Sequence, residues 1–176
     1  MARKNDVLLV DGYNIIGAWP ELERLKEQDL EDARDRLLDM LADYQGFTGM
    51  QIYVIFDAHQ VSGLGSTYKQ HKLIIVYTRE KETADECIER LCTELISRRR
   101  NVYVATSDLV EQHVAFGKGA LRVSARELYI DITQNVKVIR DSIREGVDKP
   151  GKRNTLDQNI SLDVWSKLER MRRGDK

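Results

Sequence analysis

The stretch Val7–Asn14, with the sequence V-L-L-V-D-G-Y-N, predicts a buried strand that carries an acidic side chain to the edge of a sheet. Its four consecutive apolar residues are typical of a strand covered on both faces, as in a parallel sheet. Asp11 follows at the carboxyl end of this strand, and Gly12 permits a sharp turn. Ligands bind at that edge in open α/β sheets, so Asp11 is the first candidate for a functional side chain.

Beyond this stretch, further apolar runs alternate with segments of helical spacing. The runs cover residues 51–56, 72–77, 101–106 and 120–123, and the helical segments cover 29–44, 83–96, 109–116, 124–144 and 161–172. Residues 15–25 and 61–70 are predicted to be loops, because glycine, proline or polar residues interrupt them. Strands alternating with helices predict right-handed crossovers and a parallel sheet. The expected fold is a three-layer α/β/α sandwich with a mainly parallel sheet of four to five strands and a C-terminal helical extension.

Two helix starts carry a specific signature. Thr83 with Glu86, and Ser124 with Glu127, match the capping box in which a hydroxyl and a carboxylate each bind a backbone N–H at the start of a helix. A chain of 176 residues is long enough for one domain with a substantial core. We expect a domain over residues 1–145, and a basic linker with a C-terminal helix over 146–176 that packs on the domain or extends from it.

Composition narrows the class of protein. The chain is 41% hydrophobic and 32% charged, as in ordinary soluble proteins. No apolar run approaches the ~20 residues that cross a membrane, and no signal-peptide pattern precedes the first strand. Its two cysteines, Cys87 and Cys92, lack the spacing and histidines of a zinc site and suit a reducing compartment. We therefore expect a cytoplasmic protein without a membrane partner, and favour a monomer, although the long helix and basic tail could equally form a dimer surface.

Charge is unevenly distributed along the chain. Residues 137–176 hold 11 Lys and Arg against 7 Asp and Glu, whereas residues 1–136 hold 17 against 22. An acidic body with a basic tail suits a nuclease, whose acids hold metal while its basic flanks meet phosphate. The alternative is that the basic tail is only a solvated helix surface.

Four acids are predicted to meet at one edge of the sheet. Asp11, Asp57 and Asp108 each follow a strand, and Asp85 lies in the first turn of a helix that begins at the same edge. Carboxylates crowded together repel one another unless a cation neutralises them or some are protonated. Oxygen ligands of this kind suit Mg²⁺ or Mn²⁺. Two of the acids also have a simpler explanation: the helix dipole favours Asp85, and Asp108 could cap a helix.

Other candidates carry weaker signals. Asn14 could orient an acid or a water through its amide, or make only a local turn hydrogen bond. Several basic residues are expected around the same end of the sheet as the acids, where they could meet phosphates, or else be ordinary solvated charges: Lys69, His71, Lys72, Arg79 and Lys81. In the linker, Lys152 and Arg153 are further candidates for contact with RNA.

Several segments together resemble the NYN domain of the PIN-like nuclease superfamily, in its YacP branch. They are V-D-G-Y-N at 10–14, I-I-G-A-W-P at 15–20, F-D-A-H at 56–59, E-T-A-D-E at 82–86, A-T-S-D at 105–108, F-G-K-G-A-L-R-V-S-A-R-E-L at 116–128 and R-R-G-D at 172–175. The resemblance therefore covers nearly the whole chain, and the combination is specific although each segment alone is not.

This resemblance implies a PIN-like fold and a metal-dependent endoribonuclease that enters the ribosomal A site and cuts mRNA during translation. It implies Asp11 and Asp85 as the strongest catalytic and metal-binding candidates, Asp108 as the third metal-site acid, and Asn14 as support. Asp57 is a further metal candidate. The implied cofactor is Mg²⁺ or Mn²⁺, and the implied partners are the ribosome, mRNA and ribosomal RNA.

Two other functions stay open on the sequence. A receiver-like or phosphatase domain could use a strand-end aspartate, but receivers usually carry adjacent acids after the first strand, and the D-x-D of aspartate-nucleophile phosphatases is absent. A non-catalytic module that binds the ribosome or RNA through a PIN-like fold would show no cleavage in any context.

Overall fold

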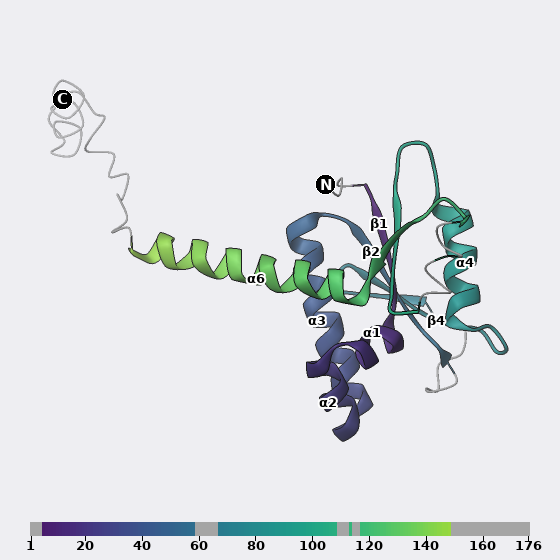
Figure 1. Ribbon diagram of the computed structural model, residues 1–176, viewed down its shortest axis with the longest axis horizontal. Helices are drawn as coiled ribbons and strands as arrows, with labels where there is room; N and C mark the ends of the chain where they lie inside the picture. Colours follow the sequence, from purple (N-terminus) through teal and green to yellow (C-terminus); the bar gives the residue numbers. More distant parts are fainter. Residues whose placement is uncertain (1–4, 59–66, 109–112, 114–116, 149–176) are drawn as a thin grey trace, which may run out of the picture. The chain divides into compact units, whose positions relative to one another are not determined.

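A computed structural model describes residues 5–58, 67–108, 113 and 117–148 (Figure 1). The chain divides into two compact units, residues 1–137 and 138–176. Within the described residues, no helix has the length and apolar character needed to cross a membrane. The first unit contains the sheet.

The first unit is built on a six-stranded sheet with the order β3-β4-β2-β1-β5-β6. All neighbouring pairs are parallel except β3 with β4. Val10 of β1 lies between Val54 of β2 and Ala105 of β5, so the carboxyl ends of the three central strands are level. The strands are β1 Val7–Asp11, β2 Gln51–Phe56, β3 Thr67–Gln70, β4 Leu73–Tyr77, β5 Val102–Thr106 and β6 Leu121–Ser124.

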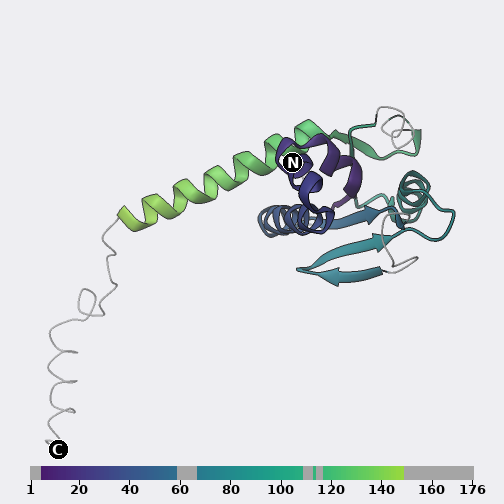
Figure 2. The ribbon, with the colours of Figure 1, turned by 90° about the horizontal axis from the view of Figure 1, so that it is seen from below.

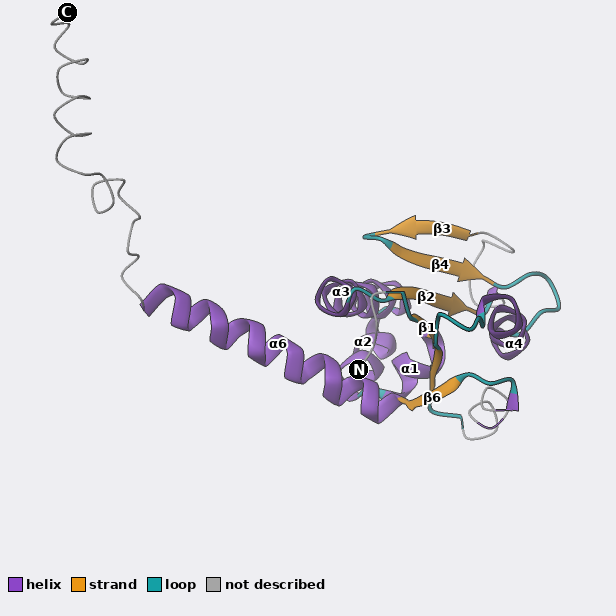
Figure 3. Ribbon diagram, turned by 90° about the horizontal axis from the view of Figure 1, so that it is seen from above, coloured by secondary structure: helices purple, strands orange, loops and turns teal. Residues whose placement is uncertain are grey.

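Helices cover both faces of this sheet, which confirms the predicted three-layer α/β/α fold. They are α1 Gly12–Ala18, α2 Pro20–Gln28, α3 Leu30–Thr48, α4 Ala84–Leu95 and the start of α6 Ala125–Asp148, whose residues from 138 on belong to the second unit. Alternate residues of β1 point to opposite faces, as in any strand. Leu8 and Val10 belong to the core under α1, α2, α3 and the start of α6, whereas Val7 and Leu9 belong to the core under α4. Figure 3 shows α3 and α4 on opposite sides of the strands.

Two segments predicted to be loops are regular structure. Residues 15–25 form most of α1 and α2, because Pro20 begins α2, where its missing N–H costs no hydrogen bond, and Gly17 is exposed on α1. Part of the predicted loop 61–70 is β3, which pairs antiparallel with β4 at the edge of the sheet (Figure 2). The sheet therefore has more strands than the four to five predicted.

Trp19, between α1 and α2, fastens the start of α6 to the core. Its side chain is 1% exposed, and its indole Nε1 donates a hydrogen bond of 2.8 Å to the carbonyl of Ala125. The Trp19 and Tyr129 rings are 5.3 Å apart between centroids. A buried indole N–H needs such an acceptor, so the tryptophan sets the position at which α6 leaves β6.

Both predicted capping boxes are confirmed. Glu86 N donates to Thr83 Oγ1 at 3.2 Å and Thr83 N donates to Glu86 Oε2 at 3.0 Å, which begins α4. The equivalent bonds between Ser124 and Glu127 are 3.1 and 2.7 Å long. The predicted helix over 161–172 lies outside the described residues, as does nearly all of the predicted helix over 109–116, and the predicted domain boundary at 145/146 stays a prediction.

Candidate active site

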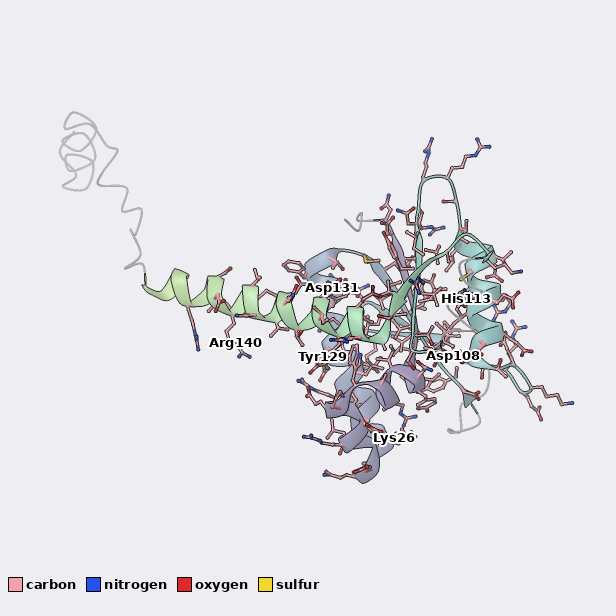
Figure 4. The ribbon with its side chains drawn as sticks, in the orientation of Figure 1. Lys26, Asp108, His113, Tyr129, Asp131 and Arg140 are labelled. Atoms are coloured by element: carbon pink, nitrogen blue, oxygen red, sulfur yellow. The ribbon has the colours of Figure 1, made fainter. Side chains whose placement is uncertain are left out.

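The carboxyl edge of the sheet brings four acids together. Asp11 is the last residue of β1 and also the N-cap of α1, where its Oδ1 accepts a 3.3 Å hydrogen bond from Asn14 N. Asp57 directly follows β2, and Asp108 follows β5 by two residues. Asp85 lies in the first turn of α4. Figure 4 labels Asp108 at this edge, close to the start of α1.

The charges of these acids act on one another. Asp11 is 8% exposed, and burial raises its pKa from about 3.8 to about 6; the N–H of Asn14 opposes this shift, and the negative charges of Asp85, Asp57 and Asp108 add to it. Burial also raises the pKa of Asp85, followed by the charges of Asp108 and Asp57. Repulsion weakens with distance, and here Asp57, Asp85 and Asp108 all act on Asp11. The four acids therefore form one electrostatic cluster.

The donor set of this cluster fits a hard divalent cation that retains its water. Its side chains offer only carboxylate oxygens, which suit Mg²⁺ or Mn²⁺ and not zinc. Among the described residues, no three His, Cys, Asp or Glu side chains are close enough to enclose a metal ion. Mg²⁺ typically keeps several waters and takes only one or two carboxylates directly, so a more open arrangement suffices.

Asn14 ties the end of β5 to the start of α1. Its Oδ1 accepts hydrogen bonds from Thr106 Oγ1 at 3.1 Å, from Ser107 Oγ at 2.6 Å and from Ser107 N. Thr106 Oγ1 in turn accepts a 3.1 Å bond from Asp108 N. Since the backbone N–H of Asn14 also binds Asp11, one residue links the strand ends that carry two of the acids. Asn14 is therefore a positioning residue in this structure.

Asn14→Ala should lower the free energy of unfolding by about 1–3 kcal/mol, because Thr106, which is fully buried, loses its hydrogen bond to Asn14 Oδ1. It should also weaken stabilisation by Mg²⁺, because the ends of β1 and β5 are no longer tied together. Urea unfolding with and without Mg²⁺ measures both effects. Asn101→Ala, an exposed change at the other edge, is the control and should shift stability by less than about 0.5 kcal/mol. Equal stability of the two variants would contradict this role of Asn14.

Beside the acids lies a row of aromatic rings with one arginine, which the sequence analysis missed. The Tyr13 and Phe56 ring centroids are 5.0 Å apart, and Phe56 and Tyr77 stack at 5.7 Å. Arg34 Nη1 donates to Tyr13 Oη at 3.4 Å. Burial raises the pKa of Tyr13, Arg34 opposes this shift, and Asp57 is close enough to add to it. Tyr13 and Tyr77 are half-buried, whereas Phe56 between them is fully buried. Aromatic rings with an accessible face stack on nucleic-acid bases and guanidinium groups bind phosphate, so the two tyrosines and Arg34 suit a single RNA strand.

The predicted basic residues separate into two groups. Arg79 and Lys81 follow β4 and lie at the edge that carries the acids. Because β3 runs antiparallel to β4, the turn between them, which contains His71 and Lys72, lies at the opposite, amino-terminal edge. Lys69 pairs with Ile74 in the half of β4 nearer that edge. The prediction that Lys69, His71 and Lys72 flank the acids is therefore wrong. Lys152 and Arg153 lie outside the described residues.

Comparison with known proteins agrees with this arrangement. The family model for the YacP-like NYN domain matches residues 8–173. The protein YacP of Bacillus subtilis (strain 168) is 44% identical over 171 residues, which are 97% of this chain and 98% of that protein.

Solved structures give the same result. The crystal structure of Rae1 (YacP) from Bacillus subtilis superimposes with a TM-score of 0.72 at 44% identity, covering 97% of this chain and 96% of that one. The structure of a mutant of that protein, in which leucine replaces a tryptophan, superimposes with a TM-score of 0.74 at 41% identity, covering 86% and 89%. A nuclease-like, RNA-related function follows from this likeness. The chain belongs to the family of YacP-like NYN domain proteins.

Proposed function

We propose that this protein is a cytoplasmic endoribonuclease that depends on Mg²⁺ or Mn²⁺ and cuts mRNA in the ribosomal A site during translation. The observation that best supports nuclease activity is the electrostatic cluster of four acids at the carboxyl edge of the sheet. Asp11 in this cluster is buried, which raises its pKa to about 6. Structural residues gain nothing from such repulsion, whereas a cation would relieve it.

Asp11, Asp85 and Asp108 would hold a hydrated metal ion, one or two of them directly and the others through its waters, with Asp57 beside them. A metal ion held there would lower the pKa of a bound water and would stabilise the negative charge that develops on phosphate oxygens. In the hydrolysis a water oxygen bonds to phosphorus, one bridging P–O bond breaks, and the leaving oxygen takes up a proton. Asn14 keeps the ends of β1 and β5 in place, and Tyr13, Tyr77 and Arg34 orient the substrate strand.

The ribosome enters this proposal through the resemblance to the YacP branch, which implies cleavage in the A site. The basic residues of the linker, Lys152 and Arg153, would then contact ribosomal RNA. A nuclease that requires the ribosome would be inactive on naked RNA, so it is distinguished from a non-catalytic RNA-binding module only in a translating system.

The test compares wild type with Asp85→Asn in an actively translating extract that contains Mg²⁺, with new mRNA 5′ ends mapped. Wild type should produce defined 5′ ends that disappear when translation is blocked, and Asp85→Asn should produce none while keeping the same far-UV circular dichroism. Asp35→Asn, an exposed aspartate on α3, is the matched control and should cut like wild type. Unchanged mRNA with wild type, with every variant still sedimenting with ribosomes, would support the binding module instead.

A further inference from the structure

A cavity of about 540 Å³ opens at the amino-terminal edge of the sheet, opposite the acids. Among the described residues that line it, the charged ones are all cations: Lys72, Arg99 and Arg100. They come from two turns that are far apart in sequence, the β3–β4 turn and the turn between α4 and β5. The rest of the lining is mostly polar and includes Gln45 and Ser97.

The turn that carries Lys72 has an uncommon backbone. His71 and Lys72 have φ angles of 50° and 70°, in the left-handed region where two-residue hairpin turns usually place Asn and Gly. Gln45 at the end of α3 holds this turn: its Nε2 donates to the carbonyl of Lys72 at 3.3 Å and to that of Met50 at 3.1 Å. Lys72 therefore occupies a backbone conformation that favours a smaller residue. The hydrogen bond from Gln45 on α3 helps to hold it in that conformation.

Hydrogen bonds also hold the turn that contains Arg99 and Arg100. Arg100 N donates to the carbonyl of Ser97 at 3.3 Å, and Arg100 Nε donates to the carbonyl of Leu95 at 3.1 Å. Next in the chain, Asn101 N donates to Oδ1 of the fully buried Asp6 at 3.0 Å. Both turns are thus held in place, so the backbone positions that carry the three cations are fixed before any ligand arrives, which lowers the entropic cost of binding.

We propose that the surface formed by Lys72, Arg99 and Arg100 is a second RNA-binding surface, which holds the phosphate backbone of RNA outside the nucleotides being cut. The proposal rests on the proposed function, since it assumes that RNA is the partner. The strands between the two edges are about 16 Å long at ~3.3 Å per residue, so a single phosphodiester cannot reach both.

The chemistry of the lining favours RNA over an acidic protein. Interfaces with nucleic acids are polar and strongly positive, whereas stable protein interfaces contain an apolar centre. Met50, the apolar residue of the lining, is 4% exposed. Arginine also suits phosphate in particular, because its planar guanidinium can donate two parallel hydrogen bonds to it.

The test measures the binding of a fluorescein-labelled RNA hairpin by anisotropy, over a series of salt concentrations. Every protein carries Asp85→Asn, so that cleavage does not interfere. Lys72→Asn removes the charge with a residue that tolerates the left-handed backbone, and Arg99→Gln removes a second charge. Each should weaken binding about 3- to 10-fold and lower the slope of log K against log salt by about 0.7–0.9 for each phosphate that is no longer neutralised.

Lys26→Asn and Arg24→Gln are the matched controls, since they make the same charge changes at exposed positions on α2 (Figure 4 labels Lys26). If Lys72→Asn and Arg99→Gln bind with the affinity and salt slope of these controls, the proposal is wrong. Competition by poly-glutamate as effective as that by unlabelled RNA would assign the surface to an acidic protein and also overturn it. If Lys72→Asn weakens RNA binding as expected, but the protein with Asp85 intact shows no cleavage in a translating extract, the result would instead contradict the proposed nuclease activity alone.

Discussion

Asp11→Asn is expected to make the metal-free protein more stable at pH 7.5 and, at the same time, to slow RNA cleavage strongly. Asp11 is buried beside three other acids, so its ionised form is unfavourable in the folded chain. Asparagine keeps the N-cap oxygen that accepts from Asn14 N, and it is as good an N-cap as aspartate. The substitution therefore removes the repulsion and keeps the local hydrogen bond.

The gain in stability should depend on pH in a defined direction. The pKa of Asp11 is about 6 in the folded protein and about 3.8 in the unfolded chain, so the folded protein binds more protons between these values. Raising the pH through this window therefore destabilises wild type, and above pH 6 the full penalty of about 2–3 kcal/mol is present. Asp11→Asn should melt about 4–10 °C higher than wild type at pH 7.5 and show almost no gain at pH 4.

Thermal melts in EDTA at pH 4, 5, 6 and 7.5 measure this effect, and Asp35→Asn is the control for the loss of one exposed negative charge. Addition of Mg²⁺ should raise the melting temperature of wild type more than that of Asp11→Asn, because the variant has lost a ligand. Cleavage should fall on the order of 10²- to 10³-fold. A variant less stable than wild type at pH 7.5 would show that Asp11 is not held at a repulsive site.

Gly12→Ala should strongly destabilise the protein, because its Cβ would overlap the ring of Phe56. That ring is fully buried and contacts both Tyr13 and Tyr77, so it has little room to move. Overpacking of this kind costs about 1–3 kcal/mol, and occasionally more. We expect a loss of about 3 kcal/mol in the free energy of unfolding and a matching loss of cleavage, since Asp11 is the preceding residue.

Urea unfolding measures the change, with Gly17→Ala as the matched control. A Cβ at Gly17, in the same helix, meets no atom within 4 Å, so alanine there should be neutral or stabilise by up to about 1 kcal/mol. In the double variant Gly12→Ala/Phe56→Leu the two costs should not add, because the smaller side chain makes room for the methyl group. Strictly additive costs would mean that Gly12 is required for another reason.

The sequence singled out Gly12 correctly but suggested the wrong reason why glycine is needed there. A sharp turn was predicted there, yet Gly12 is the first residue of α1 and is absent from the residues with positive φ. What requires glycine is the close approach of a ring from β2, a strand that follows only after three intervening helices. No local pattern contains that information.

The overlooked elements have related explanations. α1 and α2 are only 7 and 9 residues long, too short to show helical periodicity. β3 has the sequence T-Y-K-Q, which is too polar to resemble a core strand, and it exists because β4 offers it an edge to pair with. That antiparallel pairing reverses the chain and carries Lys72 to the edge opposite the acids.

Local sequence was sufficient to predict three features: the alternation of apolar strands and helices, both capping boxes, and an acid after each of three strands. Each of these features depends on residues that are close together in the chain. Folding in three dimensions was needed to establish that Asp11, Asp57, Asp85 and Asp108 act on one another, that Asn14 joins β1 to β5, and that Lys72 belongs with Arg99 and Arg100. Those relations depend on strand order and direction, and both are set by packing between segments that are distant in the chain.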